Sequence, residues 1–457
     1  MSGDLVLAID QGTSSTKCVL VDRSGAIVRE TSAPVPIRYP RPGWVEQDAE
    51  EILDSVLAAA TRCLNGLDRK AVTAVGLSTQ RESAVVWDRG TGRPAGPVLG
   101  WQDQRTRASC DALREQGLAG RIREISGLPL DPMFSAAKLR WLLDRSPGAV
   151  AGTVDAWLLF ALTGSHQIEV GNASRTQLLD VRAGKWSPEL LDIFGLPSSA
   201  LPVVTPSSGA LGRIGSRGGV LAGLPITAVL GDSHAALYAH GVSGVKVTYG
   251  TGSSVMRLGS APGSADAVCL TVAWNDQLAM EGNIRSSGAT VAWLADLIGV
   301  SPSQIEQMAL NASSDGVHLV PAFGGLAAPW WDDAAVGLIS GLTLGTRAPQ
   351  LARAALESIA HQVTDVVDAM GGADRILADG GASANDLLMR IQADLAGVPV
   401  HRARAANLSA LGAAFLAGGI TGWSLDYDDF EPGPRDPAVR LAWRDAVRRA
   451  RTPLEGS

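Results

Sequence analysis

The chain has 457 residues, which is too long for one ordinary hydrophobic core and predicts two or three domains. Its 46% hydrophobic and 19% charged content is typical of a folded globular protein, which excludes an intrinsically disordered chain. The net charge of −7 argues against a nucleic-acid partner, because contact with a phosphate backbone needs a positive field.

The first 80 residues predict a β-meander followed by a helix and a further strand. Short apolar runs separated by polar turns predict strands at 5–9, 17–22 and 26–30. Asp48, with Glu51 three residues later, has the spacing of a capping box, and apolar residues then recur at helical spacing to about residue 63. The run 71–79 predicts a buried strand. Strands followed by a helix and another strand are typical of an α/β domain.

The same pattern returns near the middle of the chain. Residues 245–259 again place a turn of Gly, Thr and Ser between two apolar runs. We therefore place the domain boundary so that the halves are 1–241 and 242–457, with a nucleotide cleft between them. A long amphipathic pattern predicts a helix at 349–370, whose apolar face would serve either the core or a homodimer interface.

Cysteine content and the apolar tracts bear on the cellular compartment. The thiols Cys18, Cys63, Cys110 and Cys269 are too few for a disulfide framework and include no C-x-x-C pair, so we expect buried free thiols in a reducing compartment. The first ten residues lack the pattern of a signal peptide. The longest apolar tract, 410–420, is too short to span a bilayer. We expect a cytoplasmic protein with no membrane partner.

A polar turn that carries a carboxylate follows the first strand. In IDQGTSSTK (9–17), Asp10 is followed by a glycine and small hydroxyl residues, whose N–H and O–H groups can face phosphates. Asp10 could hold Mg²⁺ through its water shell. The alternative is a solvated β-turn. The G-x-x-x-x-G-K-[ST] pattern is missing, which excludes a P-loop protein.

Two neighbouring segments, 78–88 and 99–106, combine charge with an aromatic ring. Arg81 offers a fork of donors and Glu82 an acceptor, a pair suited to vicinal hydroxyls on a small polar ligand. Trp101 could cover a carbon chain with its ring face. The alternative is an ion pair at a strand end, with no ligand.

A second carboxylate follows a strand in VLGDSHAALYAHG (229–241). Asp232 comes directly after a glycine and before an Ala-rich helical stretch, which is where α/β folds present functional groups. A carboxylate there can accept the proton of an attacking hydroxyl. The alternative for Asp232 is a helix N-cap, and we interpret His234 and His240 as helix-face residues.

Three glycine-rich segments lie in the second half: 248–254, 285–290 and 377–386. Glycines beside hydroxyl and amide side chains allow a backbone to approach a nucleotide closely. One such loop is weak evidence, but three in one half, each after a strand-like run, favour a nucleotide site.

Taken together, these segments resemble the FGGY carbohydrate kinases, and within that family the glycerol kinases, over about residues 5–420. The stretches that carry the resemblance include AIDQGTSSTK, STQRESAVVWDRGTGRP, GWQDQRT, NASRTQLLD, GDSHAAL, TYGTGSS and DGGASANDLLMR. The resemblance implies an α/β fold of two ribonuclease-H-like domains, of the actin and hexokinase type, flanking a nucleotide cleft. It also implies an ATP- and Mg²⁺-dependent kinase, with substrate and catalytic groups in the first domain and nucleotide binding in the second.

The resemblance also implies roles for individual residues. The family's catalytic base falls on Asp232, and its metal site on Asp10 and Asp232. Its phosphate-handling turn falls on Thr13, Ser14 and Ser15. Its substrate-binding residues fall on Arg81, Glu82 and Trp101, and its nucleotide positions on Thr251, Gly288, Gly381 and Asn385.

Three substrate-pocket positions depart from the glycerol kinase pattern. Met133 stands where the family has Tyr, Ser233 where it has Gln, and Ser254 where it has Phe. These changes remove two hydrogen-bonding groups and one wall, so they should weaken recognition of glycerol and admit a longer chain. We expect an ATP-dependent kinase for a four- or five-carbon polyol or ketose, with glycerol still possible.

Two alternatives stay open from the sequence. One is a ketose kinase of the xylulokinase or ribulokinase type, although the Met-His pair of xylulokinases is absent at Arg81–Glu82. The other is a non-catalytic, nucleotide-dependent binding protein, since one fold hosts many functions. Retention of Asp10, Arg81, Glu82 and Asp232 argues against the second.

Overall fold

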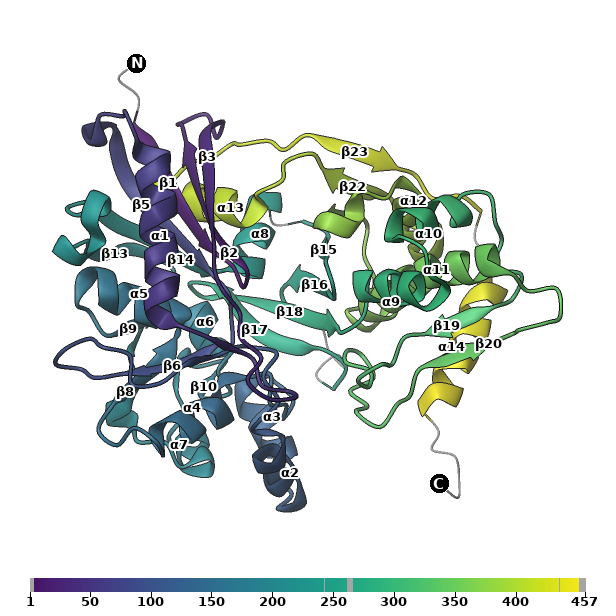
Figure 1. Ribbon diagram of the computed structural model, residues 1–457, viewed down its shortest axis with the longest axis horizontal. Coiled ribbons are helices and arrows are strands. Elements are labelled where there is room, and N and C mark those ends of the chain that lie inside the picture. The colour runs from purple at the N-terminus through teal and green to yellow at the C-terminus, as the bar shows by residue number, and fades with distance from the viewer. Residues whose placement is uncertain (1–3, 242, 261–265, 435, 452–457) are drawn as a thin grey trace. The chain divides into compact units, whose positions relative to one another are not determined.

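The computed structural model describes residues 4–241, 243–260, 266–434 and 436–451 (Figure 1). The chain divides into two units. Unit 1 is Met1–Gly241 with Leu270–Leu278 and Asn407–Ser424, and unit 2 is Val242–Cys269 with Ala279–Ala406 and Leu425–Ser457. Residue 242, where we start the C-terminal domain, lies outside the described residues, as do the ends 1–3 and 452–457.

Unit 1 is built on a six-stranded sheet in the order β13-β14-β5-β1-β2-β3. Its strands are β1 (Leu5–Gln11), β2 (Ser15–Val21), β3 (Ile27–Pro34), β5 (Val72–Thr79), β13 (Ser208–Arg213) and β14 (Pro225–Gly231). The first three form the predicted antiparallel meander, and β5 and β14 are added parallel to β1. The carboxyl ends of β1, β5 and β14 therefore meet at one edge of the sheet.

Helices and a smaller sheet complete unit 1. The helices are α1 (Ala49–Leu64), α2 (Arg107–Glu115), α3 (Ala119–Ser126), α4 (Ser135–Leu143), α5 (Val154–Thr163), α6 (Val170–Ser174), α7 (Pro188–Phe194), α8 (Asp232–His240) and α13 (Leu408–Gly418). The smaller sheet has the order β4-β7-β6-β8, with β4 (Glu46–Gln47), β6 (Ala84–Trp87), β7 (Val98–Leu99) and β8 (Val150–Thr153). Short pairs join β9 (Gln167–Glu169) to β12 (Val203–Thr205), and β10 (Leu179–Asp180) to β11 (Lys185–Trp186).

Side-chain size alternates along the central strands of unit 1 and decides how close each helix lies. Leu7 and Ile9 of β1 are fully buried in the cluster that includes residues of α1 and α5. Ala8 of β1 points to the opposite face, because neighbours in a strand alternate. On β5, a Cβ added at Gly76 would collide with the carbonyl group of Ala413 in α13. These small residues let α13 lie directly on the sheet.

Helix α13 also contacts α8 through backbone atoms. A Cβ added at Gly412 would collide with the carbonyl group of Ala235 in α8. Beyond the helix, the indole of Trp423 donates to the carbonyl of Ala239, 2.8 Å away. Because α8 begins at Asp232, this close packing sets the position of that carboxylate.

Unit 2 repeats the strand order of unit 1. Its strands run in the order β18-β16-β15-β21-β22-β23, with β15 (Val245–Tyr249), β16 (Ser253–Leu258), β18 (Gln277–Ile284), β21 (Ile376–Asp379), β22 (Val400–Ala403) and β23 (Tyr427–Phe430). Strand β17 (Cys269–Trp274) belongs almost wholly to unit 1. Strands β15, β16 and β18 are an antiparallel meander, and β21 and β22 are added parallel to β15. The predicted α/β fold with two related sheets is confirmed.

The helices of unit 2 cover this sheet. They are α9 (Gly288–Ile298), α10 (Pro302–Ala309), α11 (Ala348–Ala369), α12 (Asp386–Ala396) and α14 (Pro437–Arg451), and a short pair joins β19 (His318–Val320) to β20 (Leu338–Ser340). Helix α11 matches the predicted helix at 349–370. Its apolar residues, among them Ile359, Val363 and Val366, are buried within unit 2, so this face belongs to the core.

Three smaller expectations can be compared with the structure. All four cysteines are buried free thiols, as predicted. No helix in the described ranges is long and apolar enough to cross a bilayer. At α1, Asp48 accepts hydrogen bonds from the amides of Glu50 and Glu51, as predicted, but the Glu51 carboxylate turns to the guanidinium of Arg38. The reciprocal half of the capping box is replaced by this ion pair.

The contact between α13 and α8 predicts that Gly412→Ala is destabilising. The added methyl group has no space, and such overpacking usually lowers the free energy of unfolding by about 1–3 kcal/mol. Gly120→Ala in α3 is the matched control, since nothing lies within 4 Å of its added Cβ. The control should be neutral or stabilising by up to about 1 kcal/mol. Urea denaturation of both variants measures the difference, and equal midpoints would contradict the packing argument.

Candidate active site

Two carboxylates and a serine lie together where the central strands of unit 1 end. Asp10 is the last but one residue of β1 and pairs in register with Ser78 of β5. The Ser78 hydroxyl donates to Oδ1 of Asp10 over 2.8 Å. Asp232 follows β14 directly as the first residue of α8, so it is not the N-cap, which is Gly231.

Burial makes Asp10 an unusual carboxylate. Its pKa is raised to about 6, first by burial and further by the charge of Asp232, while the Ser78 hydrogen bond and the charge of Lys17 lower it. Asp10 and Asp232 therefore act on one another electrostatically. A shared cation would relieve this repulsion.

Asp232 is held by two donors that leave it accessible. Nε of Arg81 donates to Oδ1 of Asp232 over 3.1 Å, and the amide of Ser233 donates to the same oxygen over 2.6 Å. The Asp232 side chain is 37% exposed, whereas that of Arg81 is 7% exposed. The aliphatic part of Arg81 lies against Gly231, where a Cβ would collide with it. Glycine at this position therefore permits the ion pair.

Glu82 is fixed by a buried ion pair and an unusual backbone. Nε of Arg175, which is fully buried, donates to Oε1 of Glu82 over 2.6 Å. The backbone carbonyl of Glu82 accepts from the Ser135 hydroxyl over 3.0 Å. Glu82 has a φ of +61°, a left-handed conformation that costs roughly 1–3 kcal/mol in a non-glycine residue. Such strain at a buried carboxylate is typical of functional sites.

Trp101 and the 12–15 turn are in contact. The indole N–H of Trp101 donates to Oγ1 of Thr13 over 3.1 Å, and the Trp101 side chain is partly exposed. Ser14 at the tip of the turn is exposed, while Thr13 and Ser15 are partly exposed. The turn predicted to handle phosphate therefore lies beside the predicted substrate-side Trp. Met133, also partly exposed, follows a tight bend in which its amide donates to Asp131 over 2.8 Å.

A buried amide network under the turn was missed by the sequence argument. The Gln80 amide donates to Oε1 of Gln11 over 3.1 Å and to Oε1 of Gln47 over 3.0 Å. The Gln47 amide in turn donates to the carbonyl of Thr13 over 2.7 Å. These glutamines tie the end of β1, the turn and the segment before Glu82 together. Gln11 and Gln80 lie inside the DQG and TQRE motifs, but nothing in their spacing indicates that their side chains meet.

Lys17 is a second residue that the sequence argument passed over. It lies opposite Asp10 in the β1–β2 register, and its ammonium donates to Oδ1 of Asn407 over 2.9 Å. Asn407 is the N-cap of α13, almost 400 positions later in the chain. Its approach to Lys17 could not be read from local sequence.

In unit 2, two of the glycine-rich segments are joined by backbone hydrogen bonds. The amide of Gly288 donates to the carbonyl of Gly250 over 3.0 Å, and that of Ala289 donates to the carbonyl of Thr251 over 3.0 Å. The hydroxyls of Ser253 and Ser287 share a hydrogen bond of 2.7 Å. The turn after β15 thus caps the N-terminus of α9.

Glycines at these crossings are required by space. A Cβ at Gly252 would collide with the carbonyl of Ile284, and one at Gly380 would collide with the backbone of Tyr249. Gly380 also has a φ of +92°, which only glycine adopts readily. The segment 377–386 is therefore packed against the strand that leads into the 250–252 turn, and all three glycine-rich segments meet.

Polar atoms and open space remain at this meeting point. A Cβ at Gly381 would meet nothing within 4 Å. Asn385 caps α12 by accepting the amide of Leu388 over 3.0 Å, while its own Nδ2 has no partner among the described residues. Elsewhere on β16, the buried Oγ of Ser254 also lacks a partner in the described part of the chain. These donors are available to a ligand.

Comparison of the sequence with models of known protein families identifies the family of this chain. The N-terminal domain model of the FGGY family of carbohydrate kinases matches residues 5–239, and the C-terminal domain model of the same family matches residues 245–419. The chain belongs to the FGGY family of carbohydrate kinases. It is therefore a phosphotransferase that acts on a polyol or sugar.

Similar proteins agree with this assignment. An apulose kinase of Pectobacterium atrosepticum is 42% identical, covering 98% of each chain. A glycerol kinase of Burkholderia ambifaria is also 42% identical, covering 99% of each chain. Among solved structures, the glycerol kinase of Plasmodium falciparum with ADP has a TM-score of 0.88 at 28% identity, and 99% of each chain is covered.

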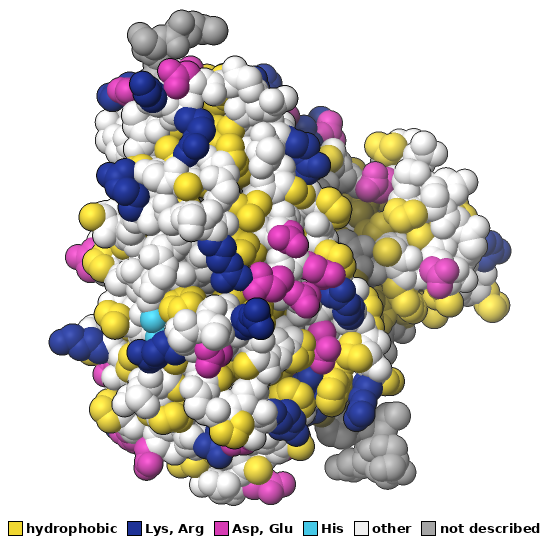
Figure 2. All heavy atoms as spheres, turned by 60° about the vertical axis from the view of Figure 1, so that its left-hand side comes forward, with side chains coloured by type: hydrophobic (Ala, Val, Ile, Leu, Met, Phe, Trp, Pro, Cys, Tyr) yellow, Lys and Arg dark blue, Asp and Glu magenta, His cyan; other side chains and the backbone are white. Residues whose placement is uncertain are grey.

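The surface of the kinase carries charges of both signs. On the face drawn in Figure 2, Lys and Arg side chains alternate with Asp and Glu side chains, and hydrophobic side chains are scattered between them.

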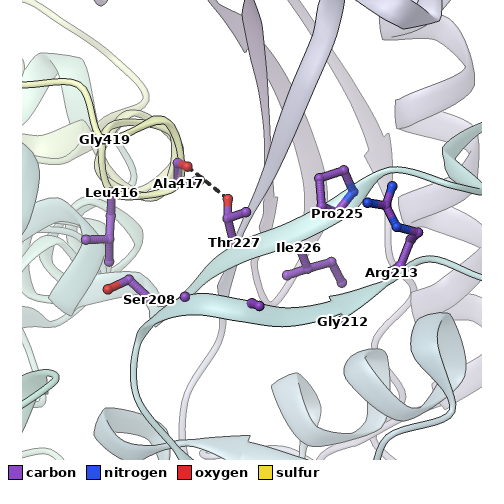
Figure 3. Close-up of a pocket in the computed structure, with 11 residues that line it drawn as sticks. Ser208, Gly212, Arg213, Pro225, Ile226, Thr227, Leu416, Ala417 and Gly419 are labelled. Carbon is purple, nitrogen blue, oxygen red and sulfur yellow. Dashed lines mark hydrogen bonds between the residues drawn. The ribbon is translucent and has the colours of Figure 1, made fainter.

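A cavity of about 550 Å³ in unit 1 lies away from the predicted site residues. It is lined by the β13–β14 hairpin and the end of α13, as Figure 3 shows. Thr227 in this cavity donates to the carbonyl of Ala417 over 2.9 Å. None of the residues predicted for substrate or nucleotide lines it.

The buried ion pair between Arg175 and Glu82 can be tested by substitution. Arg175→Met should lower the free energy of unfolding by about 3–5 kcal/mol, because the Glu82 carboxylate then stays buried without its cation. Adding Glu82→Gln removes that charge and should recover a substantial part of the loss. Urea denaturation of the two variants measures this. If the double variant is no more stable than Arg175→Met, Arg175 does not stabilise the protein through its ion pair with Glu82.

Proposed function

We propose that this kinase transfers the γ-phosphoryl group of ATP, with Mg²⁺, to a hydroxyl of a small polyol or ketose. The observation that carries the proposal is the arrangement at the strand ends of unit 1. There a partly exposed Asp232, paired with Arg81, lies together with Asp10, and Glu82 is fixed by the buried Arg175. We further propose that residues 1–241 hold the substrate and the catalytic carboxylate, and that residues 242–457 bind the nucleotide.

The glycine-rich segments of unit 2 fit a nucleotide. Gly381 faces open space, and Nδ2 of Asn385 is buried without a partner among the described residues. Thr251 and Gly288 lie where the 250–252 turn meets α9. Backbone and amide donors without bulky side chains suit the sugar and phosphates of ATP. The structure of the Plasmodium falciparum glycerol kinase contains ADP, which supports an adenine nucleotide as a ligand of this kinase.

The carboxylates of unit 1 fit Mg²⁺. No group of three or more His, Cys, Asp or Glu side chains suited to a metal is found in the described ranges. A pair such as Asp10 and Asp232 is what Mg²⁺ needs when waters and substrate phosphates complete its shell. We propose that Asp10 holds the ion, with Asp232 nearby. Bound MgATP would supply the phosphoryl group and neutralise part of its charge.

Each proposed residue then has one chemical task. Asp232 accepts the proton of the attacking hydroxyl, and the hydrogen bonds from Arg81 and Ser233 orient its carboxylate. Glu82 accepts hydrogen bonds from substrate hydroxyls, since Arg175 holds it in place. Trp101 covers the carbon chain, and Thr13, Ser14 and Ser15 offer donors to the phosphates.

The acceptor is proposed to be a four- or five-carbon polyol or ketose. Met133, Ser233 and Ser254 replace larger or more polar residues of the glycerol kinase pattern, so the pocket should hold a longer chain less selectively. The second candidate is a ketose kinase of the xylulokinase or ribulokinase type, and one of the similar proteins is itself named an apulose kinase. We place the reaction in the cytoplasm, where four free thiols would stay reduced.

Asp232→Asn tests the catalytic assignment. Loss of the general base should lower kcat by about 10²–10⁴-fold, while binding of ADP to the variant stays unchanged. Asp111→Asn, at an exposed ion pair on α2, is the matched control and should keep full activity. A coupled assay of ADP release measures kcat, and calorimetric titration with ADP measures the affinity of each variant for ADP. An Asp232→Asn enzyme with normal turnover would exclude Asp232 as the base.

A substrate panel tests the size argument. The enzyme should have a higher kcat/KM for one four- or five-carbon polyol or ketose than for glycerol. The triple change Met133→Tyr, Ser233→Gln and Ser254→Phe should shift that ratio toward glycerol by about 10–100-fold. If the unchanged enzyme uses glycerol alone, the pocket changes are compensated elsewhere and the size argument is wrong.

A further inference from the structure

Lys138 is a buried cation that the proposed mechanism does not use. It lies on α4 and is fully buried. Its ammonium donates to the carbonyl of Gly100 over 3.1 Å and to the carbonyl of Met133 over 2.6 Å. A buried ammonium is costly unless it is hydrogen-bonded, so these contacts are what allow a lysine at this position.

The two carbonyls belong to separate loops that carry substrate-side residues. Gly100 immediately precedes Trp101, and Met133 is itself one of the pocket positions. One loop follows β7 of the smaller sheet, and the other leads into α4. The two carbonyls are 33 positions apart in the sequence, so the ammonium acts as a cross-link between separate segments.

Each loop also has its own carboxylate. Asp103 accepts the amide of Val45 over 2.6 Å, and Asp131 accepts the amide of Met133 over 2.8 Å. Burial lowers the pKa of Lys138 to about 8, while the charges of Glu82, Asp103 and Asp131 raise it. The ammonium is therefore largely charged near neutral pH, and its bonds to the carbonyls are charge-assisted.

We propose that Lys138 is a positioning residue for the acceptor: by holding the carbonyls of Gly100 and Met133 together, it sets the spacing between Trp101 and the side chain at position 133. This rests on the proposed function of these two residues. The spacing limits which carbon chains fit, so Lys138 acts on substrate binding and specificity through its neighbours and does not touch the reacting atoms.

The test compares Lys138→Met with Arg140→Met. Both remove a cation from α4, but Arg140 has an exposed side chain that pairs with Asp144. Two measurements are made on each full-length variant: amide hydrogen exchange at residues 99–106 and 131–135, and kinetics with the best acceptor of the panel. Lys138→Arg, which keeps charge and donors, serves as the conservative variant.

In Lys138→Met, exchange should quicken at both loops together. KM for the acceptor should rise by about 10–100-fold with kcat changed less than about threefold, because charged hydrogen bonds that order the ground-state site are lost. Arg140→Met should leave both readouts unchanged, and Lys138→Arg should recover part of the KM. If Lys138→Met does not fold, Lys138→Arg alone tests the proposal. In that case Lys138→Arg must raise KM for the acceptor with little change in kcat.

The outcomes separate this proposal from the proposed function. Unchanged loops and an unchanged KM in Lys138→Met would overturn the role of Lys138. The wild-type enzyme could also phosphorylate no acceptor in the panel while both loops exchange faster in Lys138→Met. That result would support the cross-link by Lys138 and overturn the proposed acceptor-binding function of Trp101 and Met133. Equal losses in kcat and kcat/KM would also overturn the proposal, since they indicate damage to the chemical step.

Discussion

The position of Asp232, the proposed catalytic base, depends on elements that touch through their backbones. Gly412 of α13 lies against Ala235 of α8, and Gly76 of β5 lies against Ala413 of α13. Without side chains at these crossings, α8 and α13 approach as closely as their main chains allow. Asp232 at the start of α8 is then fixed relative to Asp10 at the end of β1, and the ion pair with Arg81 follows from that geometry.

The two units position their ligand-facing groups in different ways. In unit 1 the atoms proposed to act on the substrate are in side chains, and these are oriented by buried partners, as Arg175 orients Glu82 and Ser78 orients Asp10. In unit 2 they are mostly backbone groups, and glycines such as Gly380 remove the obstacles around them. The proposed acceptor site relies on charged side chains held in place, whereas the proposed nucleotide site can rely on main-chain donors to phosphates.

Local patterns were enough to predict the strands and helices around the site, because Asp10 lies at the end of a clear apolar strand and Asp232 directly follows another. The contacts between residues far apart in the sequence could not be predicted. Nothing near Lys17 points to Asn407, and nothing near Glu82 points to Arg175, since such partners are chosen by the tertiary fold. The strained φ of Glu82 is likewise invisible in sequence, because glutamate has no preference for that conformation.

The return of residues 407–424 to unit 1 has a consequence for synthesis on the ribosome. A nascent chain that ends at Gly241 already contains the six strands of the first sheet but lacks α13. The face later covered by Leu411 and Phe415 then stays open to water. Domains usually fold as they emerge, but this one must wait until nearly the whole chain has been made. During that interval the first half would depend on chaperones or on transient contacts to avoid aggregation.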